Sequence, residues 1–334
     1  MNILIYGGKG WIGQQFIDIL KKEKINHIIS ETRVNKYDDI YDVDFIEIWT
    51  KSQIPLNVAH YDAWIPNPGQ NFIINTSVLA EFNSLKVIST PSTGTNHISS
   101  EDCIRKSVKL FGLMDQRKGL NEISASAEFT FLKILASLRN IRYSWNEVSN
   151  LRWRDNENEM RGSEVKEKSF GLIGMGRIGN NIVRYLNAFN AKDIKFYDIN
   201  VERDELNIAT KSSLDTIFQG SDVVVVCVAL NNETNQLITY NLLSKLSEGA
   251  HLINTSRGEI INEEDLLSIL KERPDINFSA DVLSGEVKNG TLNKDILKLH
   301  NENRINITPH IAGATHGSQK KAADLAFSIL ENNV

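Results

Sequence analysis

The chain has 334 residues, of which 41% are hydrophobic and 24% charged, and its formal net charge is −5 at pH 7. This length predicts two domains, and the composition is typical of a globular protein rather than a disordered one. Because no run is rich in Lys and Arg, we expect no nucleic-acid partner.

The cysteines and the apolar runs exclude further classes of protein. Cys103 and Cys227 lie far apart in the sequence, so they predict neither a disulfide framework nor a cysteine zinc site, and we expect no metal. No basic segment precedes the apolar N-terminus, which argues against a signal peptide. The longest apolar run, 223–230, is much shorter than the roughly 20 residues of a membrane helix. We therefore expect a cytoplasmic protein without membrane contact.

The first third of the chain contains short elements. Four are predicted before residue 90: a strand at 2–6, a helix at 11–22, and strands at 72–75 and 86–89. Residues 125–139 have apolar side chains at helical spacing and follow Ser124, a candidate N-cap. The polar stretch 152–168 predicts an exposed loop in which Arg152 belongs to a solvated face.

From residue 169 onward, strand and helix patterns alternate. Strands are predicted at 170–173, 194–197, 223–230, 251–254, 278–280 and 305–308, and helices at 178–189, 214–218, 241–245, 263–271 and 318–332. This alternation predicts βαβ units and a parallel sheet. The run 223–228 is apolar throughout, as in strands that helices cover on both faces. The fold class is therefore α/β.

A glycine motif, Gly174-Met-Gly176-Arg177-Ile178-Gly179, follows a predicted strand and opens a predicted helix. In a dinucleotide site the first glycine makes a tight turn, the second lets the backbone approach a pyrophosphate, and the third lets the helix pack on the strand. The helix N-terminus adds N–H groups and a positive dipole end. This order predicts a dinucleotide site.

Asp198 strengthens that prediction, since it ends the next predicted strand, 19 residues after Gly179. A carboxylate here accepts from a ribose 2′-hydroxyl and repels a 2′-phosphate, so NAD is favoured over NADP. The alternative is a structural glycine turn followed by a surface aspartate, but the order of strand, turn, helix, strand and acid favours the nucleotide site.

A second glycine pattern, with Gly7, Gly10 and Gly13, follows the first strand. This spacing resembles the opening of extended short-chain reductases and epimerases, which leaves a sugar-nucleotide reductase-like N-terminus as an alternative. Glu31 is the one candidate for the acid of such a site, and no Tyr-x-x-x-Lys pair is present. We favour a tight turn between strand and helix in a flavodoxin-like domain.

Three ionisable residues follow the C-terminal ends of late strands: Arg257, Glu286 and His310. Open α/β sheets bind ligands at that edge. Arg257 can hold a carboxylate through two parallel N–H bonds, and His310 can exchange a proton near neutral pH. Glu286 beside His310 would favour the imidazolium and fix its tautomer. Each has a structural alternative when taken alone, and their shared location favours catalysis.

These motifs resemble those of the D-isomer-specific 2-hydroxyacid dehydrogenases over roughly residues 60 to 330. The resemblance rests on the motifs at 174–179, 254–258, 281–286 and 309–310 and on the segment 85–98. It implies an NAD-dependent oxidoreductase that interconverts a small 2-oxo acid and a (D-)2-hydroxy acid. It also implies a homodimer. Departures such as Asn96, where the family has Asp, bear on the substrate and remove no catalytic residue.

The resemblance also implies the architecture and further site residues. A Rossmann-type nucleotide domain at 120–316 would be inserted into a flavodoxin-like substrate domain at 1–119 and 317–334. The backbone N–H groups of Thr93 and Gly94 would bind the substrate carboxylate. Asp281 would bind the nicotinamide amide, and Val228, Thr234 and Thr255 would contact the cofactor. An NAD-sensing binding protein similar to the corepressors of this family is the alternative function, because they keep the same motifs.

Overall fold

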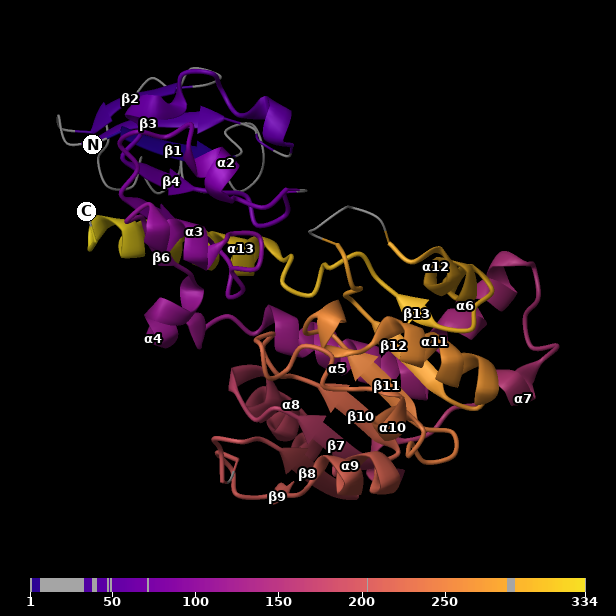
Figure 1. Ribbon diagram of the computed structural model, residues 1–334. Helices are drawn as coiled ribbons and strands as arrows, with labels where there is room; N and C mark the ends of the chain where they lie inside the picture. Colours follow the sequence, from indigo (N-terminus) through magenta and orange to yellow (C-terminus); the bar gives the residue numbers. More distant parts are fainter. Residues whose placement is uncertain are drawn as a thin grey trace. The chain divides into compact units, whose positions relative to one another are not determined.

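The computed structural model describes residues 2–6, 33–37, 41–46, 48, 50–70, 72–202, 204–286 and 292–333. The chain divides into two compact units (Figure 1). The discontinuous unit comprises Met1–Ile123, Glu286–Gly290 and Ala314–Val334, and the central unit comprises Ser124–Gly285 and Thr291–Gly313. The domain boundaries predicted after residues 119 and 316 stay a prediction.

The discontinuous unit is built on a mostly parallel sheet. Among the described residues its strand order is β2-β3-β1-β4-β5-β6, in which β2 is antiparallel to β3 and the other pairs are parallel. The parallel strands follow the flavodoxin-like order, as predicted. The bounds are β1 Asn2–Tyr6, β2 Arg33–Tyr37, β3 Tyr41–Ile46, β4 Ala63–Ile65, β5 Val87–Ser89 and β6 Lys109–Phe111.

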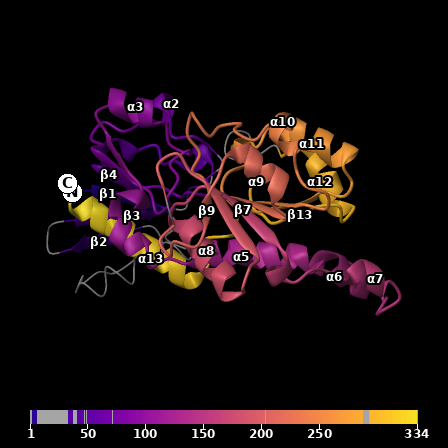
Figure 2. The same ribbon diagram turned by 90° about the horizontal axis from the view of Figure 1, so that it is seen from below.

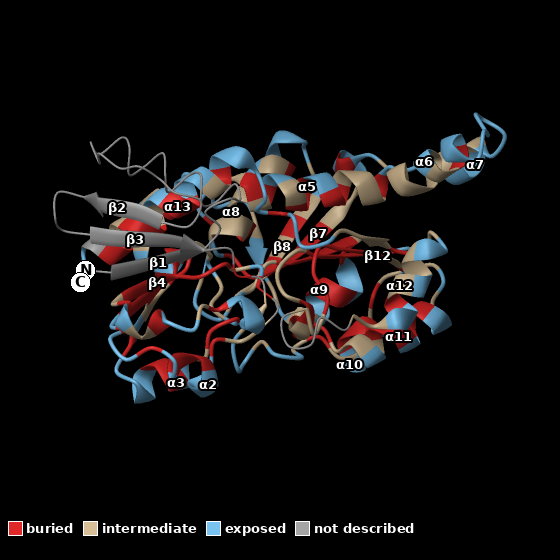
Figure 3. Ribbon diagram, turned by 90° about the horizontal axis from the view of Figure 1, so that it is seen from above, coloured by how far each residue is buried: buried red, intermediate tan, exposed pale blue. Residues whose placement is uncertain are grey.

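Helices cover both faces of this sheet. The short helices α2 and α3 lie on one face and the C-terminal helix α13 on the other (Figures 2 and 3). On the α2 side, Trp64 of β4 stacks on Phe82 with ring centroids 5.0 Å apart, inside a cluster of buried apolar residues. The bounds are η1 Lys51–Gln53, η2 Val58–His60, α2 Thr76–Leu79, α3 Ser100–Arg105, η3 Leu113–Gln116, α4 Arg117–Leu120 and α13 His316–Glu331.

The strand predicted at 72–75 is wrong. Only Ile74 pairs, in an isolated bridge to Ile98. The reason is Asn75, whose side chain accepts hydrogen bonds from the backbone N–H groups of Ser77 and Val78 and so caps α2. α2 therefore begins at Thr76, directly after the predicted segment, and the chain turns away before a strand forms.

The central unit has a sheet whose described strands pair in parallel throughout, in the order β13-β12-β11-β10-β7-β8-β9. The order reverses at β7, as in the Rossmann fold, so the predicted α/β class with two kinds of sheet is confirmed. The bounds are β7 Ser169–Ile173, β8 Asp193–Tyr197, β9 Thr210–Lys211, β10 Val223–Val226, β11 His251–Asn254, β12 Asn277–Ala280 and β13 Asn306–Ile307.

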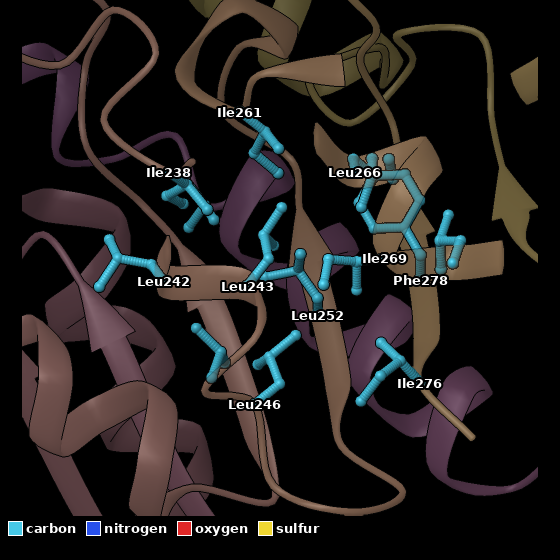
Figure 4. Packing of buried hydrophobic residues seen from close by; sticks show 14 of the residues in the cluster. Ile238, Leu242, Leu243, Leu246, Leu252, Ile261, Leu266, Ile269, Ile276 and Phe278 are labelled. Atoms are coloured by element: carbon cyan, nitrogen blue, oxygen red, sulfur yellow. The ribbon is translucent and has the colours of Figure 1, made fainter. Parts of the chain in front are cut away.

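Helices α5 and α8 cover one face of this sheet, and α9, α10 and α11 cover the other (Figures 2 and 3). Figure 4 shows the second layer, where Leu243 of α10, Leu252 of β11 and Ile269 of α11 belong to one buried cluster. The bounds are α5 Ala125–Leu138, α6 Ile141–Ser149, α7 Glu157–Met160, η4 Val165–Glu167, α8 Arg177–Ala188, α9 Leu214–Gly220, α10 Tyr240–Leu243, η5 Gly258–Ile260, α11 Glu263–Glu272 and α12 Lys294–Asn301.

One strand predicted in this unit needs correction, and one predicted exposed residue has a buried partner. The strand predicted at 223–230 is too long, because β10 ends at Val226 and the chain then runs past the glycine turn. Arg152 is exposed, as predicted, and it forms a two-bond ion pair with Glu147, which is 1% exposed. A buried carboxylate needs such a partner, and the sequence pattern could not show that Glu147 is buried.

Candidate active site

The glycine turn lies between β7 and α8. Gly174 has φ +102°, and a Cβ atom there would lie 2.8 Å from the backbone nitrogen of Val228. A Cβ atom on Gly179 would lie 2.3 Å from the carbonyl oxygen of Gly174, so the helix packs closely on the turn. At Gly176, by contrast, a Cβ atom would meet nothing within 4 Å. The turn thus leaves open space in front of the α8 N-terminus, which fits a pyrophosphate.

Asp198 follows β8 and binds the glycine turn. One carboxylate oxygen accepts from the backbone N–H of Met175 at 2.8 Å, and the other accepts from Asn200 and Val201 at 2.8 and 3.1 Å. Because a carboxylate offers about four acceptor positions, a ribose hydroxyl can still bind. The bond to Met175 adds a structural role that the spacing did not predict.

Other predicted cofactor residues lie at the start of α8 and in the segment after β10. Arg177 and Ile178 open α8 and are half-buried, and burial lowers the pKa of the Arg177 guanidinium. The carbonyl of Val228, after β10, accepts from the hydroxyl of Ser256. Thr234 Oγ1 donates to the carbonyl of Ala229 at 2.6 Å. These bonds order the segment after β10 beside the loop after β11.

The loop that carries Arg257 is fixed by Asn254, the last residue of β11. The Asn254 side chain donates to the carbonyl of Arg257 at 3.0 Å and accepts from the N–H of Ser256 at 3.1 Å. A Cβ atom on Gly258 would lie 2.0 Å from the carbonyl carbon of Leu283, so the backbone after Arg257 is packed tightly. The Arg257 side chain is half-buried, and its Nη1 donates to the carbonyl of Ser256 at 2.7 Å.

Asp281 holds the turn that carries His310. Its carboxylate is 0% exposed and accepts from Thr308 Oγ1 at 2.5 Å and from the N–H groups of Ile311 and Ala312 at 3.0 and 2.7 Å. Its carbonyl accepts from the N–H of His310 at 2.8 Å. His310 is exposed and has φ +53°, a strained conformation for a non-glycine residue. Asp281 is therefore an anchor of this turn, which the sequence pattern did not indicate.

Three predicted site residues belong to the discontinuous unit. Glu286 is half-buried, Thr93 is exposed and Gly94 is half-buried in the loop after β5. The proposed pairing of Glu286 with His310 stays a prediction. The glycines at 7–13 and Glu31 lie outside the described residues.

The sequence pattern did not indicate a row of three polar side chains on α5, formed by Thr130, Lys133 and Ser137. Thr130 Oγ1 lies 2.6 Å from Thr255 Oγ1, and Ser137 Oγ lies 2.7 Å from His251 Nδ1, whose ring has its pKa lowered to about 4 by burial. Between them Lys133, which is 3% exposed, points at the β13 strand. The available signal was the spacing of three and four residues among these polar positions, which places them on one helix face.

Within the described part of the chain, no helix has the length and apolar character needed to cross a membrane. No group of three or more described His, Cys, Asp or Glu side chains is arranged to hold a metal ion.

Together the parallel sheet, the glycine turn and Asp198 define a dinucleotide-binding α/β protein. Residues 131–312 match the family model of the D-isomer specific 2-hydroxyacid dehydrogenase, NAD binding domain. The chain belongs to this family and has NAD as its cofactor. Both predictions are thereby confirmed.

Individual relatives agree with this assignment. The chain is 33% identical to a glyoxylate reductase of Thermofilum pendens over 258 residues, which cover 76% of this chain and 73% of the relative. It is 27% identical to a D-specific alpha-keto acid dehydrogenase of Enterococcus faecium over 254 residues, 73% of this chain and 75% of that protein.

Solved structures share the fold. A D-lactate dehydrogenase from Aquifex aeolicus, complexed with NAD and lactic acid, matches with a TM-score of 0.77 and 22% identity over 99% of this chain and 94% of the other. An NAD-dependent formate dehydrogenase from Staphylococcus aureus, in complex with NAD, matches with a TM-score of 0.80 and 20% identity over 99% and 95%.

Proposed function

We propose that the protein reduces a small 2-oxo acid to the (D-)2-hydroxy acid with NADH and catalyses the reverse reaction with NAD. The observation that carries this proposal is the placement of Arg257 and His310. They follow β11 and β13, which flank β12 in one parallel sheet, and the C-terminal ends of parallel strands share one edge. Their position at the edge where such sheets bind ligands supports a carboxylate-binding role for Arg257 and a proton-donor role for His310.

We assign the cofactor contacts to the residues at that edge. The turn at 174–179 and the N-terminus of α8 would hold the pyrophosphate, and Asp198 the ribose. Val228, Thr234, Thr255 and Asp281 are the remaining proposed contacts. Bound NADH supplies the hydride that C2 of the substrate gains.

The chain's own residues bind the acid and move the proton. The fork of Arg257 binds the carboxylate and polarises the 2-oxo group, and the N–H groups of Thr93 and Gly94 bind the carboxylate further. Protonated His310 gives its proton to the oxygen on C2 as negative charge develops there. We assign Glu286 as the residue that orients the His310 ring for this transfer, and in oxidation His310 accepts the proton.

The test is a panel of 2-oxo acids with NADH: glyoxylate, hydroxypyruvate, pyruvate, 2-oxoglutarate and phosphohydroxypyruvate. We expect turnover of at least one acid by the wild type and its near loss in His310→Ala, with NADH binding retained in both. Tight NADH binding with no turnover of any acid would instead favour the NAD-sensing alternative.

We further propose that the protein is a homodimer. Large apolar side chains on and after α6 support this, because Trp145 is 71%, Leu151 96% and Trp153 74% exposed. Large apolar side chains that are exposed within one short stretch of the chain favour burial in an interface. Light scattering should give twice the 37.7 kDa of one chain, and the mass of a single chain at micromolar concentration would contradict the proposal.

A further inference from the structure

A chain of hydrogen bonds leads from the interior of the discontinuous unit to the loop after β5. Ser92 Oγ donates to the carbonyl of Gly94 at 2.7 Å. Thr90 Oγ1 lies 3.0 Å from Ser92 Oγ, and His97 Nε2 lies 3.1 Å from Thr90 Oγ1. Thr90 and His97 are 0% and 2% exposed, whereas Thr93 at the loop tip is exposed. The bonds therefore connect a buried imidazole to an exposed turn.

The direction of the protons follows from the last acceptor. A carbonyl oxygen can only accept, so the single hydroxyl proton of Ser92 is used on Gly94. Ser92 must then accept from Thr90, whose own proton is thereby used. Thr90 in turn must accept from His97, so the proton of the imidazole is on Nε2. The geometry thus fixes both the order of donors and the tautomer of His97.

The backbone around this relay is fixed at both ends. The carbonyl of Ser92 accepts from the N–H of Leu113 at 2.9 Å, and the carbonyl of His97 accepts from the N–H of Ile74 at 2.9 Å. The bond from Ser92 Oγ to Gly94 closes a small ring around residue 93, a local side-chain-to-backbone bond that restricts the turn.

We propose that His97, Thr90 and Ser92 form a positioning relay that holds the turn at 92–94 in the conformation that binds the substrate carboxylate. This inference rests on the proposed function, which assigns the carboxylate to the N–H groups of Thr93 and Gly94. In this proposal the relay residues bind neither substrate nor cofactor. They act by fixing the peptide groups that do, because binding groups lose effect when displaced by about an ångström.

The kinetic test compares Thr90→Val with Thr90→Ser. Valine has nearly the shape of threonine but lacks the hydroxyl, so the relay is broken without a large change in volume. KM for the 2-oxo acid should rise between about threefold and about thirtyfold, the range expected for a lost hydrogen bond and a displaced binding group. NADH affinity should stay unchanged, since the nucleotide contacts are in the other unit. Thr90→Ser retains the hydroxyl, so its KM should stay close to that of the wild type.

Additivity provides a second test. Ser92→Ala should raise KM like Thr90→Val, and the double variant should be little worse than either single one, because each breaks the same relay. If the KM of the double variant instead rises by the product of the two single increases, Thr90 and Ser92 act independently, and the relay is overturned.

A measurement without substrate separates this inference from the proposed function. With ¹⁵N-labelled histidine, two-bond ¹H–¹⁵N correlations of the wild type should show His97 protonated on Nε2. A neutral ring protonated on Nδ1 would overturn the relay even if the kinetics behaved as expected. If the wild type turns over none of the acids, the proposed function fails, and the tautomer still decides whether the relay exists.

Discussion

Replacing the buried Lys133 by methionine should stabilise the protein at neutral pH and change how its stability depends on pH. The Lys133 Nζ lies 3.4 and 3.5 Å from the backbone and side-chain oxygens of Asn306 and 5.8 Å from the centre of the Phe129 ring. Burial lowers the pKa of Lys133 from 10.5 to about 8, with repulsion by Arg142 in the same direction and attraction by Asp281 opposing it. The charged form is therefore disfavoured in the folded protein.

The sign and size of the effect follow from this pKa. Between pH 8 and 10.5 the unfolded chain holds a proton on Lys133 that the folded chain has released, so folding stability rises with pH in that window. The full pKa shift corresponds to about 3 kcal/mol in the free energy of unfolding. Below pH 8 the wild type is less stable by this amount than it is above pH 10.5. Between pH 7 and pH 9.5 the free energy of unfolding of the wild type should rise by about 2 kcal/mol from this group. Methionine matches the length of lysine without its charge.

The assay is urea unfolding, followed by tryptophan fluorescence, at pH 7, 8 and 9.5 for the wild type and Lys133→Met. Other titrating groups cancel in the difference between the two proteins. The variant should be the more stable at pH 7, and its advantage should shrink by about 2 kcal/mol by pH 9.5. Lys298→Met, at a side chain that is 73% exposed, is the control and should give a difference that does not vary with pH. Parallel profiles for Lys133→Met and the wild type would refute the reasoning.

Four further predictions concern the site. NADH should outperform NADPH in kcat/KM, and Asp198→Ala should narrow the gap; equal use of both cofactors by the wild type would contradict this. Calorimetry should find one NAD per chain, since we interpret the glycines at 7–13 as a turn, and a second site would show otherwise. Arg257→Lys keeps the charge but loses the fork, so steady-state kinetics should show both a higher KM and a lower kcat; an unchanged KM would argue against a carboxylate contact. Asp281→Ala removes the anchor of the His310 turn and should cost roughly 2–4 kcal/mol in urea unfolding, while a loss below about 0.5 kcal/mol would mean that the anchor is dispensable.

Much of the central unit could be predicted from the sequence because its signals are local. The apolar run at 223–226 is a strand covered on both faces, and Gly174 and Gly179 are required by a positive φ and a close contact. The spacing to Asp198 is set by one strand-helix-strand unit. Such constraints act within about 30 residues and leave a pattern that can be recognised.

The parts that were missed depend on contacts between distant residues. Asp281 binds the turn at 308–312, some 30 positions along the chain, and nothing beside it in the sequence shows these partners. Lys133 is a charged residue on a helix, which normally indicates exposure, yet it is buried against β13. Glu147 is buried for the same reason, with the exposed Arg152 as its partner. Tertiary packing decides such cases, and local patterns do not record it.

The central claim is that hydride passes from NADH to C2 of a 2-oxo acid bound by Arg257. The most direct measurement is a reaction with NADH deuterated at C4 on each face in turn, using the best acid of the panel that gives a chiral product, with the product examined by mass spectrometry and chiral chromatography. The account predicts one deuterium at C2 of the D-2-hydroxy acid from one of the two labelled cofactors and none from the other. A product without deuterium from either cofactor, or an L-2-hydroxy acid, would contradict it.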